Sequence, residues 1–228
     1  MPLVSVLLPC YNAADTLEET LESLAAQTWT DFEVVAVDDG SEDATAEILR
    51  AWADRDSRFR VLSCSHGGVI AAANAGLKAC RGEFIARMDA DDRAHPERLA
   101  LQVAWLQEHP ETAAVGSLVE GFPPNEVREG FRIYIEWLNS LVDDADIRRE
   151  IFVESPLPNP SVTFRRPWLE RMGGYQERGW PEDYDLYLRM YLAGARFAKI
   201  PRVLLKWREH PRRLTRTDSR YSLENFLR

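Results

Sequence analysis

Three aspartates close together, at the end of a short apolar run, are the most chemically informative feature of this 228-residue chain. The run covers residues 84–88 and leads into Asp89-Ala90-Asp91-Asp92. Carboxylates this close repel one another and resist burial, so a fold that keeps them together needs a compensating cation. Carboxylate oxygens suit Mg²⁺ or Mn²⁺, and a diphosphate commonly supplies further oxygens. An isolated Asp-x-Asp, however, is more often an acidic turn or a helix cap.

Two further polar clusters follow apolar runs that read as strands. The sequence Pro-Cys-Tyr-Asn at residues 9–12 follows the first run, and its backbone, tyrosine or asparagine could hold a nucleobase. The sequence Asp-Asp-Gly-Ser at residues 38–41 follows the second. An acidic residue there in a Rossmann-like half accepts hydrogen bonds from ribose hydroxyls. The ordinary alternatives are a plain turn at the first cluster and an Asp-Gly turn with a helix cap at the second.

A fourth cluster, Glu182-Asp183, opens a predicted helix. The helix dipole stabilises carboxylates at that position, so plain capping would explain the pair. The functional alternative makes one of them a general base, within hydrogen-bond reach of an acceptor hydroxyl. One sheet edge could gather all four clusters, because ligands of open α/β sheets bind beyond the carboxyl ends of the strands. A shared site is therefore favoured over four unrelated turns.

The elements that would position these clusters alternate along the first half of the chain. Compact β-prone runs at residues 4–8, 32–37, 59–62 and 84–88 predict strands, separated by helices that begin near Asp15 and Asp43 and by one over residues 69–80. Crossovers of this length allow parallel pairing, and right-handed crossovers put helices on both faces. The pattern predicts a doubly wound, Rossmann-like, mainly parallel α/β sheet.

The second half is less regular. Helices are expected from Pro96, over residues 127–141 and from Tyr184 to Gly194, and strands over 113–116, 162–164 and 198–205, before an Arg-rich loop and a short helix. The apolar helix over 127–141 could serve the core, a dimer contact or a membrane surface, and the core is favoured. In the helix from Tyr184, an inward face is expected. It comprises Tyr184, Leu188, Tyr191 and Leu192.

Composition limits the class of protein. An apolar content of 45% with 10% aromatics predicts a globular chain, and one domain fits 228 residues. No apolar run approaches membrane-spanning length, and the start lacks the charged region of a signal peptide. Three cysteines without a Cys-x-x-Cys pair predict free thiols in a reducing cytosol.

Charge is distributed unevenly. The net charge of −9 combines +7 over residues 165–228 with −16 over the first 164 residues. The acidic bulk disfavours nucleic-acid binding. The basic part could face an anionic substrate or a membrane surface, although a solvated basic tail is the default interpretation.

Motifs of other enzyme classes are missing. There is no Gly-x-Gly-x-x-Gly of a dinucleotide dehydrogenase and no Gly-x-x-x-x-Gly-Lys-Ser/Thr of a P-loop enzyme. There is also no Gly-x-Ser-x-Gly elbow of a hydrolase.

Taken together, the motifs resemble those of family 2 glycosyltransferases of the GT-A fold. The resemblance runs from Val4 to about Arg216 and is carried by residues 4–12, 37–45, 74–92, 181–186 and 207–210. Each segment is modest alone, whereas their order and spacing together are specific. The segment His66-Gly67-Gly68-Val69 departs from the pattern, because many relatives carry Asn or Arg there. That departure leaves the contacts to the diphosphate or donor sugar open.

The resemblance implies a nucleotide site. Asp39, with Pro9, Tyr11 and Asn12 nearby, would hold the nucleobase, which is most often uracil in this family. Asp89 would contact the ribose or the water shell of a metal ion.

It also implies a metal site and a base. Asp91 would ligate Mg²⁺ or Mn²⁺ and His210 could complete that site, although a lone histidine in an Arg-rich loop is more often simply exposed. Asp183 would be the catalytic base. Three further residues would contact the donor sugar or support the site: Glu182, Asn74 and Arg208.

The implied enzyme is a single GT-A domain over residues 1–228, with a nucleotide-sugar half at about 1–116 and an acceptor and catalytic-base half at about 117–228. It would transfer a sugar with inversion from a UDP-sugar to a glycan or lipid-linked acceptor in bacterial surface polysaccharide biosynthesis. We expect it in the cytoplasm, with peripheral contact at the inner face of the membrane left open. The alternatives are a sugar nucleotidyltransferase and an inactive sugar-nucleotide-binding module.

Overall fold

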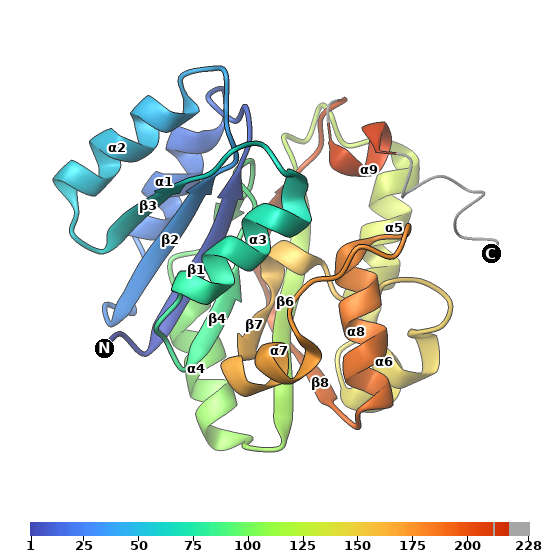
Figure 1. Ribbon diagram of the computed structural model, residues 1–228. Coiled ribbons are helices and arrows are strands. Elements are labelled where there is room, and N and C mark those ends of the chain that lie inside the picture. The colour runs from blue at the N-terminus through green and yellow to red at the C-terminus, as the bar shows by residue number, and fades with distance from the viewer. Residues whose placement is uncertain (212, 219–228) are drawn as a thin grey trace.

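One eight-stranded β-sheet organises the residues described by this computed structural model, 1–211 and 213–218, in the order β3-β2-β1-β4-β7-β6-β8-β5 (Figure 1). The strands are β1 (Val4–Cys10), β2 (Phe32–Asp38), β3 (Phe59–Ser63), β4 (Phe84–Arg87), β5 (Arg93–Ala94), β6 (Thr112–Phe122), β7 (Thr163–Arg165) and β8 (Arg196–Arg208). The helices are α1 (Leu17–Ala25), α2 (Thr45–Arg55), α3 (Gly68–Ala79), α4 (Arg98–Glu108), α5 (Glu129–Ser140), α6 (Asp144–Glu150), α7 (Arg166–Met172), α8 (Glu182–Leu192) and α9 (Leu214–Thr217), with a 3₁₀ turn η1 (Asn159–Ser161).

The first half forms the predicted parallel sheet. β1 pairs in parallel with β2 and with β4, and β2 pairs in parallel with β3. β1, β2 and β4 are buried and are nearly continuous apolar runs, as expected of strands that are covered on both faces, whereas the edge strand β3 is mostly half-buried. Every residue of β2 is buried.

The second half adds a mixed extension to the same sheet. β7 runs antiparallel to both β4 and β6, and β8 runs parallel to β6 with irregular register. Three short elements, β5, α6 and α7, were not predicted, because each has only two to seven residues and shows little periodicity. β6 also extends well beyond the predicted residues 113–116.

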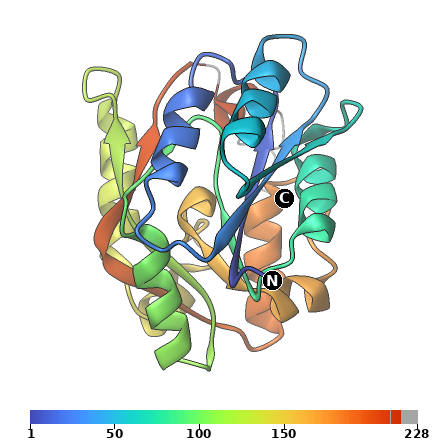
Figure 2. The same cartoon turned by 90° about the vertical axis from the view of Figure 1, so that its left-hand side faces the viewer.

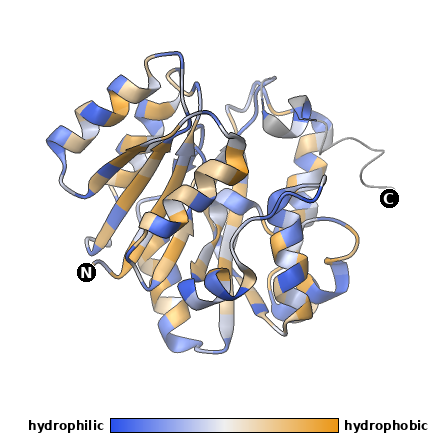
Figure 3. Ribbon diagram, in the orientation of Figure 1, coloured by the Kyte–Doolittle hydropathy of each residue, from blue (hydrophilic) through white to orange (hydrophobic). Residues whose placement is uncertain are grey.

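Helices pack on both faces of the sheet (Figure 2). One apolar cluster joins α1, α2 and α4 to the side chains of Val4, Val6 and Leu8 in β1. A second cluster joins α3, α7 and α8 to the opposite face, where Leu7 of β1 points. Because alternate strand residues point to opposite faces, β1 contributes to both clusters. Figure 3 shows the strands as largely hydrophobic, and hydrophilic residues are more frequent on α2 than on α3.

The predicted inward face of α8 was partly wrong. Leu192 is 77% exposed, whereas Leu186, Tyr187 and Met190 are buried. The side chain of Asp185 is also buried, in an ion pair with Arg189. A sequence pattern that keeps charged residues outside therefore assigns the wrong rotation to this helix.

The core interpretation of the apolar helix is confirmed, because Phe131, Ile135 and Leu138 of α5 are buried. The three cysteines are free thiols, as predicted. Among the described residues, no helix has both the length and the apolar character needed to span a membrane.

Candidate active site

The carboxyl ends of three parallel strands meet at one edge of the sheet. In the strand register Cys10 lies opposite Asp38, and Leu7 lies opposite Arg87. Beyond the paired residues, the Asp39 amide donates to the carbonyl of Cys10 at 2.9 Å. The structure therefore brings the polar clusters that follow β1, β2 and β4 to the same edge.

The aspartates after β4 form a compact acidic cluster. Asp89, Asp91 and Asp92 can each supply one carboxylate oxygen to a group whose members all lie within 4.8 Å of one another. The guanidinium of Arg87 lies 2.9 Å from Asp89 Oδ1. The pKa of Asp89 is raised, mainly by burial and also by the charge of Asp91. The positive charge of Arg87 lowers this pKa but does not cancel the increase.

Asp92 is the most deeply buried member of this cluster. Its Oδ1 accepts a hydrogen bond from the Arg208 amide at 2.8 Å, while its buried Oδ2 has no hydrogen-bond partner. Burial and the neighbouring carboxylates of Asp91 and Asp89 raise its pKa well above the ordinary range. An unpaired buried oxygen beside two further carboxylates fits a divalent cation, which prefers oxygen ligands.

The end of β8 closes the cluster from the other side. His210 Nε2 lies 2.9 Å from Asp91 Oδ2. Arg208 Nε donates to the carbonyl of Asp91 at 2.6 Å, and its guanidinium lies 4.3 Å from the centre of the Phe122 ring. The structure thus places both predicted residues, His210 and Arg208, against Asp91.

The predicted base lies at the first turn of α8. Asp183 Oδ1 accepts a hydrogen bond from the Tyr184 amide at 2.8 Å. Burial, reinforced by the buried carboxylate of Glu182 and by Asp89, raises the pKa of Asp183 to about 8. Asp89 is the member of the acidic cluster that contributes to this shift.

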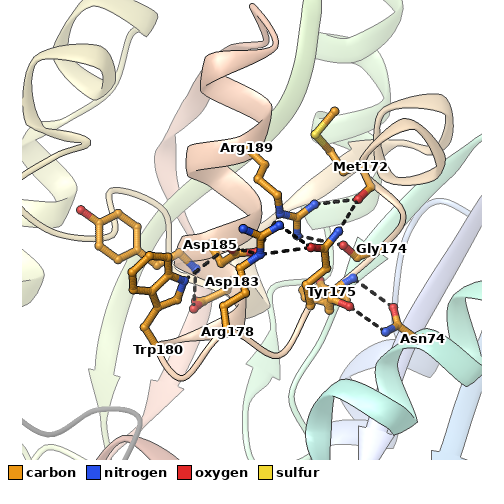
Figure 4. A network of polar contacts seen from close by, with 11 residues as sticks. Asn74, Met172, Gly174, Tyr175, Arg178, Trp180, Asp183, Asp185 and Arg189 are labelled. Atoms are coloured by element: carbon orange, nitrogen blue, oxygen red, sulfur yellow. Dashed lines mark hydrogen bonds and ion pairs between the residues drawn. The ribbon is translucent and has the colours of Figure 1, made fainter. Parts of the chain in front are cut away.

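Buried Asp185 anchors the loop that leads into α8 (Figure 4). Its carboxylate accepts hydrogen bonds from Arg189 Nε at 2.7 Å and from the Trp180 indole at 3.3 Å. Arg189 also donates to the carbonyls of Met172 at 2.7 Å and Gly174 at 3.0 Å. These contacts fix both the start and the end of the loop relative to the helix that carries Asp183.

Asn74 joins the same loop to α3 (Figure 4). Its carboxamide donates to the carbonyl of Tyr175 at 2.8 Å and accepts from the Tyr175 amide at 3.0 Å. Gly174 must be glycine here, since its φ is +75° and a Cβ would lie 2.4 Å from Asn74 Oδ1. Both polar atoms of Asn74 are thus used within the protein.

The loops after β1 and β2 are held to each other. Asn12 has a φ of +47°. Its backbone amide donates to the Ser41 hydroxyl at 3.0 Å, and its side-chain oxygen accepts a hydrogen bond from the Glu42 amide at 2.8 Å. Pro9 is half-buried near the end of β1. Asn12 therefore links the loop after β1 to the loop after β2.

At the far end of this edge, Tyr11 stacks on His66, with ring centroids 4.1 Å apart and planes 20° apart. Asp39 Oδ2 lies 2.9 Å from His66 Nδ1, and Asp39 is only 2% exposed. Its carboxylate accepts hydrogen bonds from the amides of Gly67 and Gly68, each at 2.9 Å.

Sequence reasoning missed some of the site. Arg87 is fully buried and holds Asp89, and the signal was a single cation inside an otherwise apolar strand. Arg213, packed on the rings of Phe131 and Trp207, pairs with buried Glu209 at 3.2 Å. The pair is local, since its partners are four residues apart, whereas the Phe131 ring that covers Arg213 comes from a distant segment.

A family model described as glycosyl transferase family 2 matches residues 5–173. The chain belongs to family 2 of the glycosyltransferases. It is thus a transferase enzyme, as the motifs predicted.

Curated relatives agree with this assignment. The chain is 34% identical over 210 residues to the amylovoran biosynthesis glycosyltransferase AmsE of Erwinia amylovora, covering 90% of this chain and 76% of that protein. It is 31% identical over 231 residues to the putative glycosyltransferase EpsE of Bacillus subtilis, covering 99% of this chain and 80% of that protein.

Solved structures of similar fold are GT-A glycosyltransferases, so the predicted fold is confirmed. TarS of S. aureus, in complex with UDP-GlcNAc, superposes with a TM-score of 0.75 at 24% identity, covering 91% of this chain and 58% of TarS. The mannosyltransferase PcManGT of Pyrobaculum calidifontis, in complex with GDP-Man and Mn²⁺, gives a TM-score of 0.71 at 25% identity, covering 90% of this chain and 56% of that one. The chain thus spans less than two thirds of these structures.

Proposed function

We propose that this family 2 glycosyltransferase moves a sugar from a nucleoside diphosphate to an acceptor hydroxyl, with inversion at the anomeric carbon. Two observations support the proposal: Asp89, Asp91 and Asp92 form a compact acidic cluster, and burial, Glu182 and Asp89 raise the pKa of Asp183 to about 8. A carboxylate whose pKa lies near the operating pH is suited to general-base catalysis.

In this proposal residues 1–116 bind the donor and residues 117–228 bind the acceptor and carry the base. The donor is a UDP-sugar, held at the edge where Pro9, Tyr11 and Asn12 lie near Asp39. TarS in complex with UDP-GlcNAc supports this choice, while PcManGT in complex with GDP-Man keeps a GDP-sugar among the donors to be tested.

A divalent cation, Mn²⁺ or Mg²⁺, would be held by Asp91, with His210 and the carboxylates of Asp89 and Asp92 beside it. When bound, it would neutralise charge on the departing diphosphate as a Lewis acid. Arg208 lies against Asp91 and could contribute positive charge to the same region.

The protein's own chemistry then centres on Asp183. Its carboxylate removes the proton of the acceptor hydroxyl while that oxygen forms a bond to the anomeric carbon. The bond from this carbon to the diphosphate oxygen breaks on the opposite face, and its electron pair leaves with the nucleoside diphosphate. One in-line displacement of this kind inverts the configuration. Glu182 and Asn74 support the loop and helix that hold the base.

The acceptor is a glycan or lipid-linked sugar of a bacterial surface polysaccharide. The name of AmsE, an amylovoran biosynthesis glycosyltransferase, supports this class. Peripheral contact with the inner face of the membrane stays a prediction that rests on the +7 charge of residues 165–228, part of which lies outside the described residues. The apolar face of α5 no longer favours it, because that face is buried.

Nucleotide release from a panel of UDP-, GDP-, CDP- and dTDP-sugars with Mn²⁺, with and without glycan acceptors, tests the proposal. We expect nucleoside diphosphate to accumulate with one donor class and to increase with acceptor. Release of pyrophosphate instead would indicate a nucleotidyltransferase, and tight donor binding without turnover under any condition would indicate a binding module.

A further inference from the structure

Arg98, the first residue of α4, is a buried cation whose contacts are with uncharged groups. It is only 1% exposed. Its Nη2 donates to the backbone carbonyl of Arg87 at 2.7 Å, and its Nη1 lies 3.2 Å from the sulfur of Met88. In the described part of the chain, it forms no ion pair. Because burying a guanidinium without a carboxylate partner is costly, this placement needs a reason beyond packing.

The two residues that Arg98 contacts immediately precede Asp89 in the chain. Arg98 therefore fixes the backbone from which the acidic cluster begins. The side chain of Arg87 continues the same line of contacts, since its guanidinium lies 2.9 Å from Asp89 Oδ1. Arg98 is thus connected to the first carboxylate of the cluster through one intervening residue.

Gln102 in turn holds Arg98. It lies one helical turn further along α4 and is fully buried. Its Oε1 accepts hydrogen bonds from Arg98 Nε at 3.2 Å and from the Thr163 hydroxyl at 2.7 Å. Its Nε2 donates to the carbonyls of Val115 at 3.1 Å and Ser161 at 2.7 Å. Because both donors and the acceptor of this amide are engaged, the orientation of Arg98 is fixed from behind.

The charge of Arg98 also acts on the acidic cluster. Burial lowers the pKa of Arg98 to about 10, while the carboxylates of Asp92 and Asp89 act in the opposite direction. Arg98 is therefore still a cation at neutral pH. A positive charge near the cluster repels a divalent cation, so the charge of Arg98 by itself would weaken metal binding. The charge and the contacts of Arg98 thus have opposite effects on a metal ion, and the sign of a substitution separates them.

We propose that Arg98, held by Gln102, is a positioning residue for the metal site and acts through the backbone of Arg87 and Met88. It keeps the end of β4 in the one arrangement that brings the carboxylates of the acidic cluster together. The inference rests on the proposed function, because it requires a divalent cation at that cluster. It assigns to the first turn of α4 a part in metal binding, although Arg98 forms no ion pair with the three carboxylates.

Calorimetric titration with Mn²⁺ alone tests the positioning role without requiring turnover. Arg98→Met keeps a long side chain but removes the hydrogen bonds and the charge. We expect it to bind Mn²⁺ more weakly by about tenfold or more. Loss of the charge alone would make Mn²⁺ bind more tightly, so weaker binding reports the lost position of the carboxylates. Unchanged or tighter binding by Arg98→Met would overturn the inference.

Arg165→Met is the matched control. Arg165 also donates to backbone carbonyls, those of Thr112 at 2.9 Å and His109 at 3.2 Å. In the strand register it lies opposite Phe84, at the start of β4, whereas the acidic cluster follows the end of that strand. We expect Arg165→Met to lose stability in urea denaturation but to keep its Mn²⁺ affinity. Equal weakening of Mn²⁺ binding in the two variants would mean general destabilisation and would overturn the positioning role.

Arg98→Lys separates contacts from charge in a second way. It keeps the positive charge but lacks the planar fork that reaches Arg87, Met88 and Gln102 at once. Its Mn²⁺ affinity should lie between that of the unmodified protein and that of Arg98→Met. If Arg98→Met does not fold, Arg98→Lys decides the question with Arg165→Lys as control. Affinity below that of Arg165→Lys would support the positioning role, and equal or higher affinity would refute it.

Two results separate the inference from the function beneath it. Mn²⁺ binding by the unmodified protein, together with unweakened binding by the Arg98 variants, would overturn the role of Arg98 alone. Failure of the unmodified protein to bind Mn²⁺, whether alone or with UDP or GDP, would overturn the proposed metal site as well.

Discussion

His210 Nε2 lies 2.9 Å from Asp91 Oδ2, although the two residues are 119 positions apart in the chain. The contact joins the segment after β8 to the acidic cluster after β4. Arg208 Nε also donates to the backbone carbonyl of Asp91, so His210 holds the carboxylate and Arg208 holds the backbone of this residue. Asp91 is thus placed before any ligand arrives, and predictions about metal binding centre on it.

Replacing Asp91 with Asn should abolish the Mn²⁺ dependence of donor binding, because a neutral amide is a much weaker ligand for a hard cation. We expect transfer to fall by roughly 100-fold or more. Calorimetric titration of UDP with and without Mn²⁺ measures the effect. Asp54→Asn, which neutralises an exposed aspartate on α2, is the control and should behave as the unmodified protein. Equal UDP affinity of the Asp91→Asn variant and the unmodified protein, each with Mn²⁺ present, would contradict the assignment of Asp91.

Replacing Asp183 with Asn should remove transfer while sparing donor binding, because only the proton acceptor is lost. The expected fall in turnover is about 100-fold to 10,000-fold. Steady-state turnover and the donor dissociation constant are the two measurements. Turnover close to that of the unmodified protein would show that another group serves as base.

Asp185→Asn provides the contrast, because Asp185 is an anchor rather than the base. Losing one partner of the buried pair with Arg189 should lower the free energy of unfolding by about 3–5 kcal/mol. Urea denaturation measures this loss. A variant of Asp185 with full stability would mean that the anchor is dispensable.

Turnover should depend on pH through Asp183. Burial raises its pKa to about 8, and the base must be ionised to accept a proton. The logarithm of kcat should therefore rise with pH below that value and level off above it. A bound divalent cation would shift this rise to lower pH, since positive charge favours the carboxylate. A flat profile between about pH 6 and about pH 9 would exclude Asp183 as the titrating base.

The same carboxyl should make stability depend on pH in metal-free buffer. Its pKa is raised from 3.8 in the unfolded reference to about 8, so the folded chain binds this proton more tightly. The stabilisation that the protonated carboxyl provides is fully present below pH 3.8 and is lost as the pH rises through about 8. The Asp183→Asn variant has no carboxyl to ionise at this position. Its free energy of unfolding should therefore increase relative to that of the unmodified protein as the pH rises from 3.8 to about 8. Urea denaturation at several pH values measures the difference, and a constant difference would contradict the raised pKa.

Replacing Asn74 with Ala should destabilise the loop that carries Tyr175. Two backbone groups of Tyr175 would lose their partners, at a cost of about 1–3 kcal/mol. Urea denaturation measures the loss, with the exposed Asn125→Ala as control. If Asn74→Ala instead kept full stability but lost donor affinity, direct contact with the donor sugar would be the better role.

Local patterns in the sequence were sufficient for the parallel half of the fold. Apolar runs at residues 4–8, 32–37 and 84–88 identified β1, β2 and β4, since strands buried on both faces need nearly continuous apolar sequence. The rule that such strands end at one edge then placed three polar clusters together. The family motifs identified a glycosyltransferase before any contact was known.

Only the tertiary structure decided which groups these residues meet. The contacts of Asp91 with His210 and of Asp39 with Gly67 and Gly68 join segments far apart in the chain, and no local spacing encodes them. The rotation of α8 also buries Asp185, which a hydrophobic pattern places on the outside of the helix. The sequence determined which residues could do chemistry, because residue types and strand ends are local properties. The fold determined which of them remain open to a ligand, because burial and hydrogen bonding depend on distant partners.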